Sequence, residues 1–317
     1  MDSSVIADRR RLRRKLGFWR IVAVLLLVAF GFAFYYFGFG GRPGIQRAQI
    51  AHVTISGLIR DDEELLERLK KVGEDNQVKA VVISISSTGG TTYGGERIFK
   101  AIRAIAAKKP VVSDVRTVAA SAGYMIATAG DTIVAGETSI TGSIGVIFQY
   151  PQLQDLMQKL GVSLEEIKSA PLKAEPSPFH SPSEDAKAMI RSMVLDSYDW
   201  FVDLVADRRK LPRADVLRLA DGSIFTGRQA LKAKLIDTLG GETEIRAYLA
   251  TRNIKSDLPF VDWDRSSSTP FLLAGALSQL INLLGYDDFV KGENLRGLVT
   301  EKLFLDGLLS VWQVDGN

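Results

Sequence analysis

Residues 79–86 read KAVVISIS, and this continuous run of apolar and β-branched residues constrains the fold more than any other feature. Such a run is typical of a strand buried on both faces of a parallel sheet, because a strand with one wet face would alternate. The run ends in STGGTTYGG and is followed by ERIFKAIRAIAAKK, which has the apolar period of a helix. The stretch therefore predicts a strand, a glycine turn and a helix in succession.

The same unit recurs on both sides of this run. IAHVTISGLI at residues 50–59 alternates like a strand and precedes the helical pattern of residues 61–75, while VVSDV at 111–115 precedes a second small-residue turn. Repeated strand and helix units predict an α/β fold with a largely parallel sheet. Ligand sites in such folds gather at the carboxyl ends of the strands, which is where Gly90 and Ser121 are expected.

Ser121 stands in TVAASAGYMIATAG, among residues too small to cover it and at the expected start of a helix. The first N–H groups of a helix have no intrahelical partner, so the N–H of Ala122 can face an oxyanion that forms when Ser121 attacks a carbonyl. Gly89 and Gly90 likewise let backbone N–H groups approach a ligand. The alternative interpretations are a small-residue helix start packed against a sheet and a plain tight turn.

The composition excludes several classes of function. The chain has 317 residues, 46% of them hydrophobic and 24% charged, which is a globular composition with room for one large or two ordinary domains. The net charge is +3, much of the excess lies before residue 21, and nucleic acid is therefore not an expected partner. The chain has no cysteine, which excludes disulfides and a thiol nucleophile. With two histidines, His52 and His180, a histidine-rich metal centre is not expected.

The N-terminus has the pattern of a membrane anchor. Residues 1–20 form a basic segment, and residues 21–41 are uncharged and apolar over a length that spans a bilayer. The arginine-rich flank is expected to stay in the cytoplasm, so a single-pass anchor would place the residues after about 42 outside it. A cleaved signal peptide is the alternative. Residues 42–49 are a polar linker.

A serine nucleophile needs a base, and the sequence offers two histidines, many carboxylates and a lysine held in its neutral form. His180 lies in a proline-rich loop, but no aspartate stands at a recognisable spacing from it, and a structural role is expected for His52. Lys173 lies in the proline-bounded segment PLKAEP, and a lysine acts as a base when an apolar setting lowers its pKa from about 10.4. Since a nearby carboxylate favours the charged amine, this hypothesis requires Glu175 to point away from Lys173. A solvated surface lysine is the alternative.

The remaining pattern completes the predicted domain, which covers residues 50–255. VSLEEIKSA at 162–170 predicts a strand, residues 184–210 one long helix, and residues 211–241 a helix, a turn, a strand and a helix. A C-terminal extension follows at 256–317. Its apolar stretch FLLAGALSQLINLLG is short for a membrane span, so packing, an oligomer contact or a membrane-surface helix is expected.

Five blocks carry a resemblance to a known family. They are STGG (87–90), AASAGYMIATAGDTIVA (119–135), TGSIGV (141–146), IKSAPLKAEPSP (167–178) and DGSIFTGRQALKAKLID (221–237). In this order and spacing, the chain resembles the short, membrane-anchored form of signal peptide peptidase A, a family of serine peptidases related to Clp protease. One departure is Thr88, which stands where the family usually has proline.

The resemblance implies a Clp-protease/crotonase-like fold and a Ser/Lys dyad. Ser121 is then the nucleophile, Lys173 the general base and acid, and Ser143 the residue that orients Lys173. The N–H groups of Gly90 and Ala122 form the oxyanion hole. The resemblance also implies a homo-oligomeric ring, in which the serine and lysine of one site can come from neighbouring subunits, and neither a metal nor a cofactor.

The expected function is a membrane-anchored serine endopeptidase that hydrolyses released signal peptides and similar hydrophobic peptides. A catalytically silent membrane scaffold of the same fold is one alternative, and intact Ser121 and Lys173 disfavour it. A crotonase-type enzyme that binds an acyl-thioester is another. The N-terminal anchor argues against it, because coenzyme A is not expected outside the cytoplasm.

Overall fold

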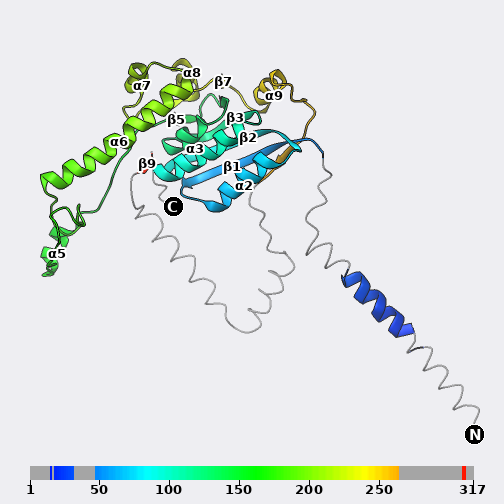
Figure 1. Cartoon of the computed structure of the whole chain (residues 1–317), viewed down its shortest axis with the longest axis horizontal. Coiled ribbons are helices and arrows are strands. Elements are labelled where there is room, and N and C mark those ends of the chain that lie inside the picture. The colour runs from blue at the N-terminus through cyan, green and yellow to red at the C-terminus, as the bar shows by residue number, and fades with distance from the viewer. Residues whose placement is uncertain (1–14, 16–17, 32–46, 264–308, 312–317) are drawn as a thin grey trace, which may run out of the picture. The chain divides into compact units, whose positions relative to one another are not determined.

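The computed structural model describes residues 15, 18–31, 47–263 and 309–311 of the chain (Figure 1). The chain divides into two compact units, Met1–Ala48 and Gln49–Asn317. In the first unit, residues 18–31 are helical. Within the described residues, no helix combines the length and the apolar composition that crossing a membrane requires. Residues 32–41 of the predicted anchor lie outside the described residues.

Three long parallel strands form the centre of the sheet in the second unit. They are β1 (Gln49–Ile59), β2 (Val78–Thr91) and β3 (Val111–Ala120), with β2 between the other two. β2 is buried at nearly every position, which accounts for its continuous apolar run. β8 (Phe260–Asp262) pairs in parallel with the outer edge of β1, so residues of the predicted C-terminal extension belong to the sheet.

The other edge of β3 is shared by two strands. Its first part pairs in parallel with β4 (Thr132–Ala135), and its last three residues pair with β5 (Ile140–Gly142). β7 (Thr238–Leu239) pairs in parallel with β4, and β6 (Ile224–Thr226) pairs antiparallel with β5. β9 (Leu309–Val311) lies antiparallel to the end of β2. The described strands thus form one mixed, largely parallel sheet, which confirms the predicted α/β class.

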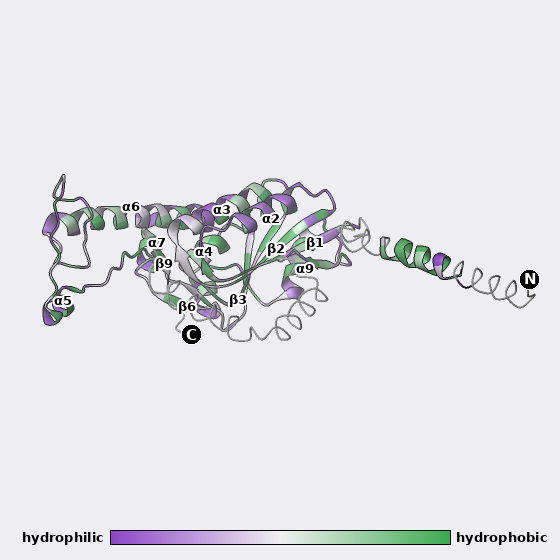
Figure 2. Cartoon of the chain, turned by 90° about the horizontal axis from the view of Figure 1, so that it is seen from below, coloured by the Kyte–Doolittle hydropathy of each residue, from purple (hydrophilic) through white to green (hydrophobic). Residues whose placement is uncertain are grey.

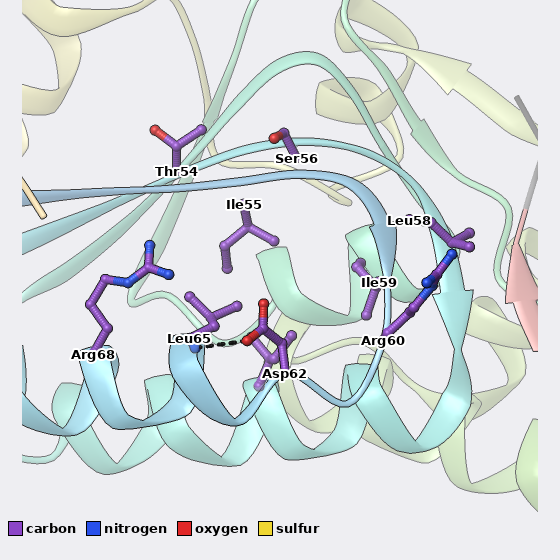
Figure 3. A pocket seen from close by; sticks show the side chains of 10 residues that line it. Thr54, Ile55, Ser56, Leu58, Ile59, Arg60, Asp62, Leu65 and Arg68 are labelled. Atoms are coloured by element: carbon purple, nitrogen blue, oxygen red, sulfur yellow. Dashed lines mark hydrogen bonds between the residues drawn. The ribbon is translucent and has the colours of Figure 1, made fainter. Parts of the chain in front are cut away.

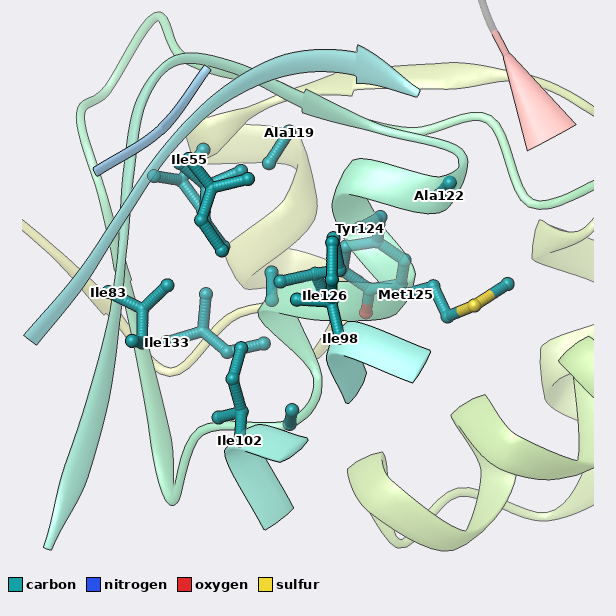
Figure 4. Close-up of a cluster of buried hydrophobic side chains, with 14 of the residues drawn as sticks. Ile55, Ile83, Ile98, Ile102, Ala119, Ala122, Tyr124, Met125, Ile126 and Ile133 are labelled. Atoms are coloured by element: carbon teal, nitrogen blue, oxygen red, sulfur yellow. The ribbon is translucent and has the colours of Figure 1, made fainter. Parts of the chain in front are cut away.

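Alternate residues of the central strands face two hydrophobic cores. The larger core lies between the sheet and the helices α2 (Glu63–Glu74), α3 (Thr92–Ala106) and α4 (Ala122–Ala127), and side chains of later helices add to it. Figure 4 shows Ile83 of β2, Ile98 of α3 and Tyr124 of α4 within it. The smaller core lies under α9 (Glu242–Thr251), where Ile245 and Leu249 face the sheet. Every residue of α4 is buried, and this packing holds the position of Ser121, which precedes the helix.

A long helix carries part of the chain away from the sheet. This helix, α6 (Glu184–Arg209), is buried near its C-terminal end at Phe201, Val202 and Val205. Its other end projects beyond the sheet and bears α5 (Gln154–Leu160) and the loop between them, as both views show (Figures 1 and 2). We call residues 154–193 the arm. After α6, the chain passes through α7 (Arg213–Leu219) and α8 (Gly227–Lys232) back to the sheet.

Several predictions can be compared with these elements. The long helix at 184–210 is confirmed as α6, and the helix, the strand and the second helix at 211–241 are found as α7, β6 and α8. The second helix was expected to end at Gly240, but α8 ends at Lys232, and Thr238–Leu239 form the strand β7. The strand predicted at 162–170 is wrong, since these residues form no helix or strand. Most of them are exposed on the arm, where no neighbouring strand offers backbone partners. The apolar stretch of the C-terminal extension lies outside the described residues, and the predicted domain boundaries stay predictions.

Candidate active site

Ser121 lies at the sharp junction between β3 and α4. It is 1% exposed, and its backbone has φ 57° and ψ −118°. Residues other than glycine rarely adopt a positive φ, and strain of this kind persists where the surroundings hold it, often at functional sites. The junction places Ser121 immediately before the first turn of a helix, as predicted.

Close packing of small residues holds this junction in place. A Cβ atom on Gly123 would lie 2.8 Å from the carbonyl oxygen of Ser87 in β2, and one on Gly95 of α3 would lie 3.2 Å from the Cβ of Ala122. The small residues are therefore needed for packing, which was the alternative interpretation of this stretch. The same packing sets Ser121 into the wall of a cavity, so both interpretations apply.

The cavity against Ser121 has a volume of about 530 Å³. Ser143 lines it together with Asp221 and a set of larger side chains that includes Ile147, Tyr198 and Leu309. The hydroxyl of Tyr198 donates to the carbonyl oxygen of Ala220 at 2.9 Å, so that ring is held in the wall. A largely apolar cavity with a few convergent hydroxyl groups suits an apolar side chain of a bound peptide.

Ser143 is brought to the same wall as Ser121 by the turn after β5. Its φ is 49°, and its N–H donates to the carbonyl oxygen of Ser223 at 2.7 Å. The preceding Gly142 has φ 91°, and a Cβ there would lie 2.6 Å from the ring of Phe225. Glycine is therefore required at this turn. The structure brings together two of the predicted site residues, Ser121 and Ser143.

The two predicted oxyanion donors lie on elements that meet at this end of the sheet. Gly90 is near the end of β2, opposite Ile59 of β1 and Ser310 of β9. A Cβ on Gly90 would lie 1.9 Å from the carbonyl oxygen of Ile59, so no other residue fits there. Ala122 is the first residue of α4. The role of both N–H groups as oxyanion donors stays a prediction.

Lys173 is not brought to Ser121 within this chain. It lies in the loop between α5 and α6 on the arm, it is exposed, and it does not line the cavity. The apolar setting predicted for it is therefore not formed by the described residues of a single chain. The condition on Glu175 is met, because its carboxylate accepts a hydrogen bond from Lys168 Nζ at 2.7 Å and forms no ion pair with Lys173.

Neither histidine lines the Ser121 cavity. His180 belongs to the arm loop and lies near its carboxylates. His52 of β1 has its Nδ1 2.5 Å from a carboxylate oxygen of Asp262 and its Nε2 2.9 Å from the hydroxyl of Ser84. These bonds link β8, β1 and β2, which is a structural role. A triad of Ser121 with a histidine is not formed in the part of the chain that the structure describes.

A second cavity, of about 330 Å³, lies between the end of β1 and the start of α2 (Figure 3). Arg60, Asp62 and Arg68 are among its lining residues, and the Asp62 carboxylate caps α2 by accepting from the N–H of Leu65 at 3.0 Å. No lysine or histidine lines it beside Ser56. Among the described residues, no group of three or more histidine, aspartate or glutamate side chains is arranged to hold a metal ion. The Ser121 cavity is thus the candidate site.

Sequence reasoning did not predict most of the apolar side chains that line this site, among them Ile147, Tyr198 and Leu309. Ile147 lies outside the named strands and makes one isolated bridge, whose partner is Leu309. The helical pattern around Tyr198 shows that one face is buried but not which cavity it faces. No sequence pattern linked Leu309 to Ser121.

Two family models match the part of the chain that forms the sheet and the candidate site. Peptidase family S49 matches residues 103–254, and Clp protease matches residues 49–139. The two ranges overlap at the β3–α4 junction, which carries Ser121. The S49 range also includes Ser143 and the arm with Lys173.

Three known proteins are similar to this chain over most of its length. A putative signal peptide peptidase SppA of Enterococcus faecium is 36% identical over 243 residues, which are 72% of this chain and 70% of that protein. A putative protease of Synechocystis sp. is 36% identical over 207 residues, 65% of this chain and 74% of that protein. Protease 4 of Haemophilus influenzae is 31% identical over 259 residues, and these are 75% of this chain but 42% of that protein.

Proposed function

Because the chain belongs to the signal peptide peptidase A family, within peptidase family S49, it is a serine peptidase, and we propose that a Ser121/Lys173 dyad cleaves released signal peptides and similar hydrophobic peptides. Ser121 Oγ attacks the carbonyl carbon of the peptide bond while neutral Lys173 Nζ accepts the hydroxyl proton. Lys173 then gives this proton to the leaving amine nitrogen. Lys173 then takes a proton from the water that attacks the resulting ester, and gives it to Ser121 Oγ as the acid product leaves.

Three further groups support these steps. The N–H groups of Gly90 and Ala122 face the oxyanion, and their stabilisation of the negative charge lowers the barrier. The hydroxyl of Ser143 accepts a hydrogen bond from Lys173 Nζ and holds it toward Ser121. This assignment is supported by the cavity that Ser121 and Ser143 share.

The observation that carries the proposal is the position of β9. This extended segment lies antiparallel to Gly89–Thr91 of β2, with Leu309 opposite Thr91. Leu309 also exchanges two backbone hydrogen bonds with Ile147, at 2.8 and 3.0 Å. The groove beside Ser121 therefore accommodates an extended chain between two backbone edges. A peptide substrate binds in the same way, by adding a strand, with an apolar side chain in the position of Leu309.

We further propose that Lys173 completes the site of a neighbouring copy in a homo-oligomeric ring. Lys173 is exposed on an arm that projects from the sheet. The arm also exposes large apolar side chains, which are Leu156, Leu160, Val162, Leu164 and Ile167. Apolar side chains gathered on a projecting segment favour contact with another protein surface. Docking on a second copy would bury Lys173 and supply the apolar setting that a neutral lysine needs.

The proposal also includes a membrane anchor at residues 21–41. Its support is the sequence pattern of an arginine-rich flank before an uncharged apolar run. The basic segment then lies in the cytoplasm and the catalytic domain in the periplasm, at the inner membrane. Released signal peptides are membrane-derived and apolar, so an anchored peptidase would meet them where they arise.

A mixing experiment tests the dyad and its assembly together. Purified Ser121→Ala and Lys173→Ala proteins are assayed on a fluorogenic hydrophobic peptide, first separately and then after co-assembly. Each is expected to be inactive alone. Co-assembly is expected to restore cleavage, because a Lys173→Ala subunit keeps Ser121 and its Ser121→Ala neighbour supplies Lys173. Lys159→Ala, which removes another exposed lysine from the arm, is the matched control and is expected to remain active.

Each other outcome has a defined meaning. Full activity of either single variant would refute the dyad. Inactive mixtures whose subunits exchange, as measured by mass spectrometry, would place both residues of a site in one chain. A wild-type protein that assembles but cleaves no peptide would favour the silent scaffold.

A further inference from the structure

Four ionisable side chains gather in the arm loop, away from the Ser121 cavity. Lys168 Nζ lies 2.6 Å from a carboxylate oxygen of Glu166 and 2.7 Å from one of Glu175. His180 Nε2 lies 3.5 Å and 3.3 Å from the same two oxygens. The Glu175 side chain is 6% exposed and that of Glu166 is 27% exposed, so Glu175 is the enclosed member of the cluster.

The pair of Lys168 and Glu175 closes the segment that carries Lys173. Residues 169–174 lie between the two partners, and Lys173 precedes Glu175 by two positions. Inside this segment the N–H of Lys173 donates to the carbonyl oxygen of Ala170 at 3.1 Å. Lys173 is thus presented on a tight turn whose two ends are joined by an ion pair.

The Glu175 carboxylate is also tied to a buried part of the arm. Its second oxygen accepts from the N–H of Ser177 at 3.3 Å, and Ser177 is 3% exposed. The carbonyl oxygen of Ser177 accepts from the side-chain amide of Gln152 at 3.3 Å. The N–H of Leu153 donates to the carbonyl oxygen of Pro178 at 2.7 Å. Glu175 therefore connects the turn to the segment that leads into α5.

The direction in which Glu175 points has an electrostatic consequence for Lys173. A carboxylate beside a lysine favours its charged form, whereas a general base must be neutral. The charged groups that face Glu175 are Lys168 before the turn and His180 after it, with Glu166 across Lys168, while the segment packed against it contributes the uncharged Gln152. The hydrogen bond from Lys168 lowers the pKa of Glu175, so its carboxylate is ionised and occupied by Lys168 at neutral pH.

We infer that Lys168 and Glu175 are positioning residues for Lys173. Their ion pair closes the turn that presents Lys173, and it holds the Glu175 carboxylate, two positions further along the chain, on Lys168 instead of the Lys173 amine. The inference rests on the proposed function, in which Lys173 is the base. It adds that Lys168 protects the neutral form of Lys173 by occupying Glu175.

The test measures kcat against pH for the full-length assembled protein on a fluorogenic hydrophobic peptide. In Lys168→Met, the freed Glu175 turns toward Lys173 and favours its charged form. The midpoint of the rising limb is expected to move up by about one pH unit, and kcat below that midpoint to fall about tenfold. In Lys168→Met/Glu175→Gln the freed charge is gone, so the midpoint is expected to return to the wild-type value. At high pH Lys173 is neutral in every variant. The value that kcat reaches there therefore reports how well the closed turn positions Lys173.

Matched variants separate this role from a structural one. Glu165→Gln removes an exposed carboxylate of the same loop and is expected to leave the midpoint unchanged. A Lys168→Met midpoint equal to that of wild type, or a double variant as shifted as the single one, would overturn the inference. Lys173→Ala is measured in parallel, and if it stays active the proposed function fails first. If Lys168→Met does not fold by circular dichroism, Lys168→Met/Glu166→Gln, which removes the other unpaired carboxylate and still leaves Glu175 without its cation, is expected to show the same shift.

Discussion

The N–H of Ser121 donates a hydrogen bond to the carbonyl oxygen of Gly142 over 2.8 Å. This bond ties the residue after β3 to the last residue of β5, immediately before Ser143. The backbone of each serine is therefore held by a main-chain hydrogen bond that does not depend on its side chain. A substitution of either hydroxyl should then change the chemistry of the site without moving the backbone.

Ser143→Ala is expected to lower kcat at least tenfold and to leave the fold intact. The hydroxyl proposed to orient Lys173 is lost, and a small misplacement of a reacting group costs a large factor in rate. The backbone bond from Ser143 to Ser223 is retained, so the thermal midpoint should not change. Peptide cleavage and thermal unfolding are measured together. Ser192→Ala, on the exposed side of α6, is the control, and an unchanged kcat in Ser143→Ala would rule out the orienting role.

Gly90→Ala is expected to lower the free energy of unfolding by about 3 kcal/mol or to prevent folding. The added Cβ would lie 1.9 Å from the Ile59 carbonyl oxygen, a backbone atom of a central strand that cannot rotate away. Gly73→Ala in α2 is the control. There the nearest atom is the flexible Cγ1 of Ile105 at 3.2 Å, and the gain in helix propensity offsets the contact to within about 1 kcal/mol. Urea unfolding measures both, and equal stabilities would contradict the steric argument.

Tyr124→Phe is expected to lower the free energy of unfolding by about 1–2 kcal/mol. The hydroxyl of the fully buried Tyr124 donates to the carbonyl oxygen of Leu235 at 2.8 Å, and phenylalanine leaves this acceptor without a partner. Tyr93→Phe removes the same group from a ring that is 58% exposed and should have no effect. Denaturant unfolding of the two variants is compared with wild type. The prediction is wrong if the two variants lose the same stability.

The parts of the fold that the sequence predicts are those with local patterns. The buried run of β2, the helical period of α6 and the small residues around Ser121 each record which neighbours they pack against. Pairing between distant segments leaves no such record. Leu309 lies opposite Thr91, although the two residues are far apart in the sequence and no local period relates them. The alternating pattern at 162–170 failed for the converse reason, since a strand pattern without an available edge does not form a strand.

The same distinction between local patterns and distant contacts holds for the candidate site. The start of α4 at Ser121 followed from one stretch, and Ser143 was implied by the resemblance. The distance between the arm and the Ser121 cavity did not follow from either, because it depends on how far α6 extends beyond the sheet. The ion pair of Lys168 and Glu175 spans seven positions of a loop, and no period of a helix or a strand predicts it.

The arm loop is expected to open in acid before the sheet does. The hydrogen bonds from Lys168 lower the pKa of Glu166 and of Glu175. A carboxyl group with a lowered pKa stabilises the folded loop above its ordinary pKa of about 4.3, and this contribution is lost as the pH falls through the lowered value. Hydrogen exchange of the loop at about pH 6 and about pH 3, corrected for the intrinsic rate, should show protection lost in the loop and kept in β2.

The matched variants for this pH effect are Glu175→Gln and Glu165→Gln. Glu175→Gln removes the enclosed carboxylate, so its loop should already exchange rapidly at about pH 6 and change less on acidification. Glu165→Gln should behave as wild type, because Glu165 is exposed and makes no ion pair among the described residues. Equal protection of the loop at both pH values in wild type would show that the carboxylates do not hold it.

Leu309→Asp is expected to lower KM for hydrophobic peptides and to leave kcat unchanged. Leu309 is 5% exposed in the apolar cavity against Ser121, and a carboxylate buried there would cost several kcal/mol. β9 should therefore leave the groove, and the apparent affinity for a peptide rises with the fraction of molecules whose groove is open. Leu309→Met keeps the volume and the apolar character and should retain the wild-type KM. If KM is the same in Leu309→Asp and wild type, β9 does not compete with peptides, and the groove beside β2 is not where they bind.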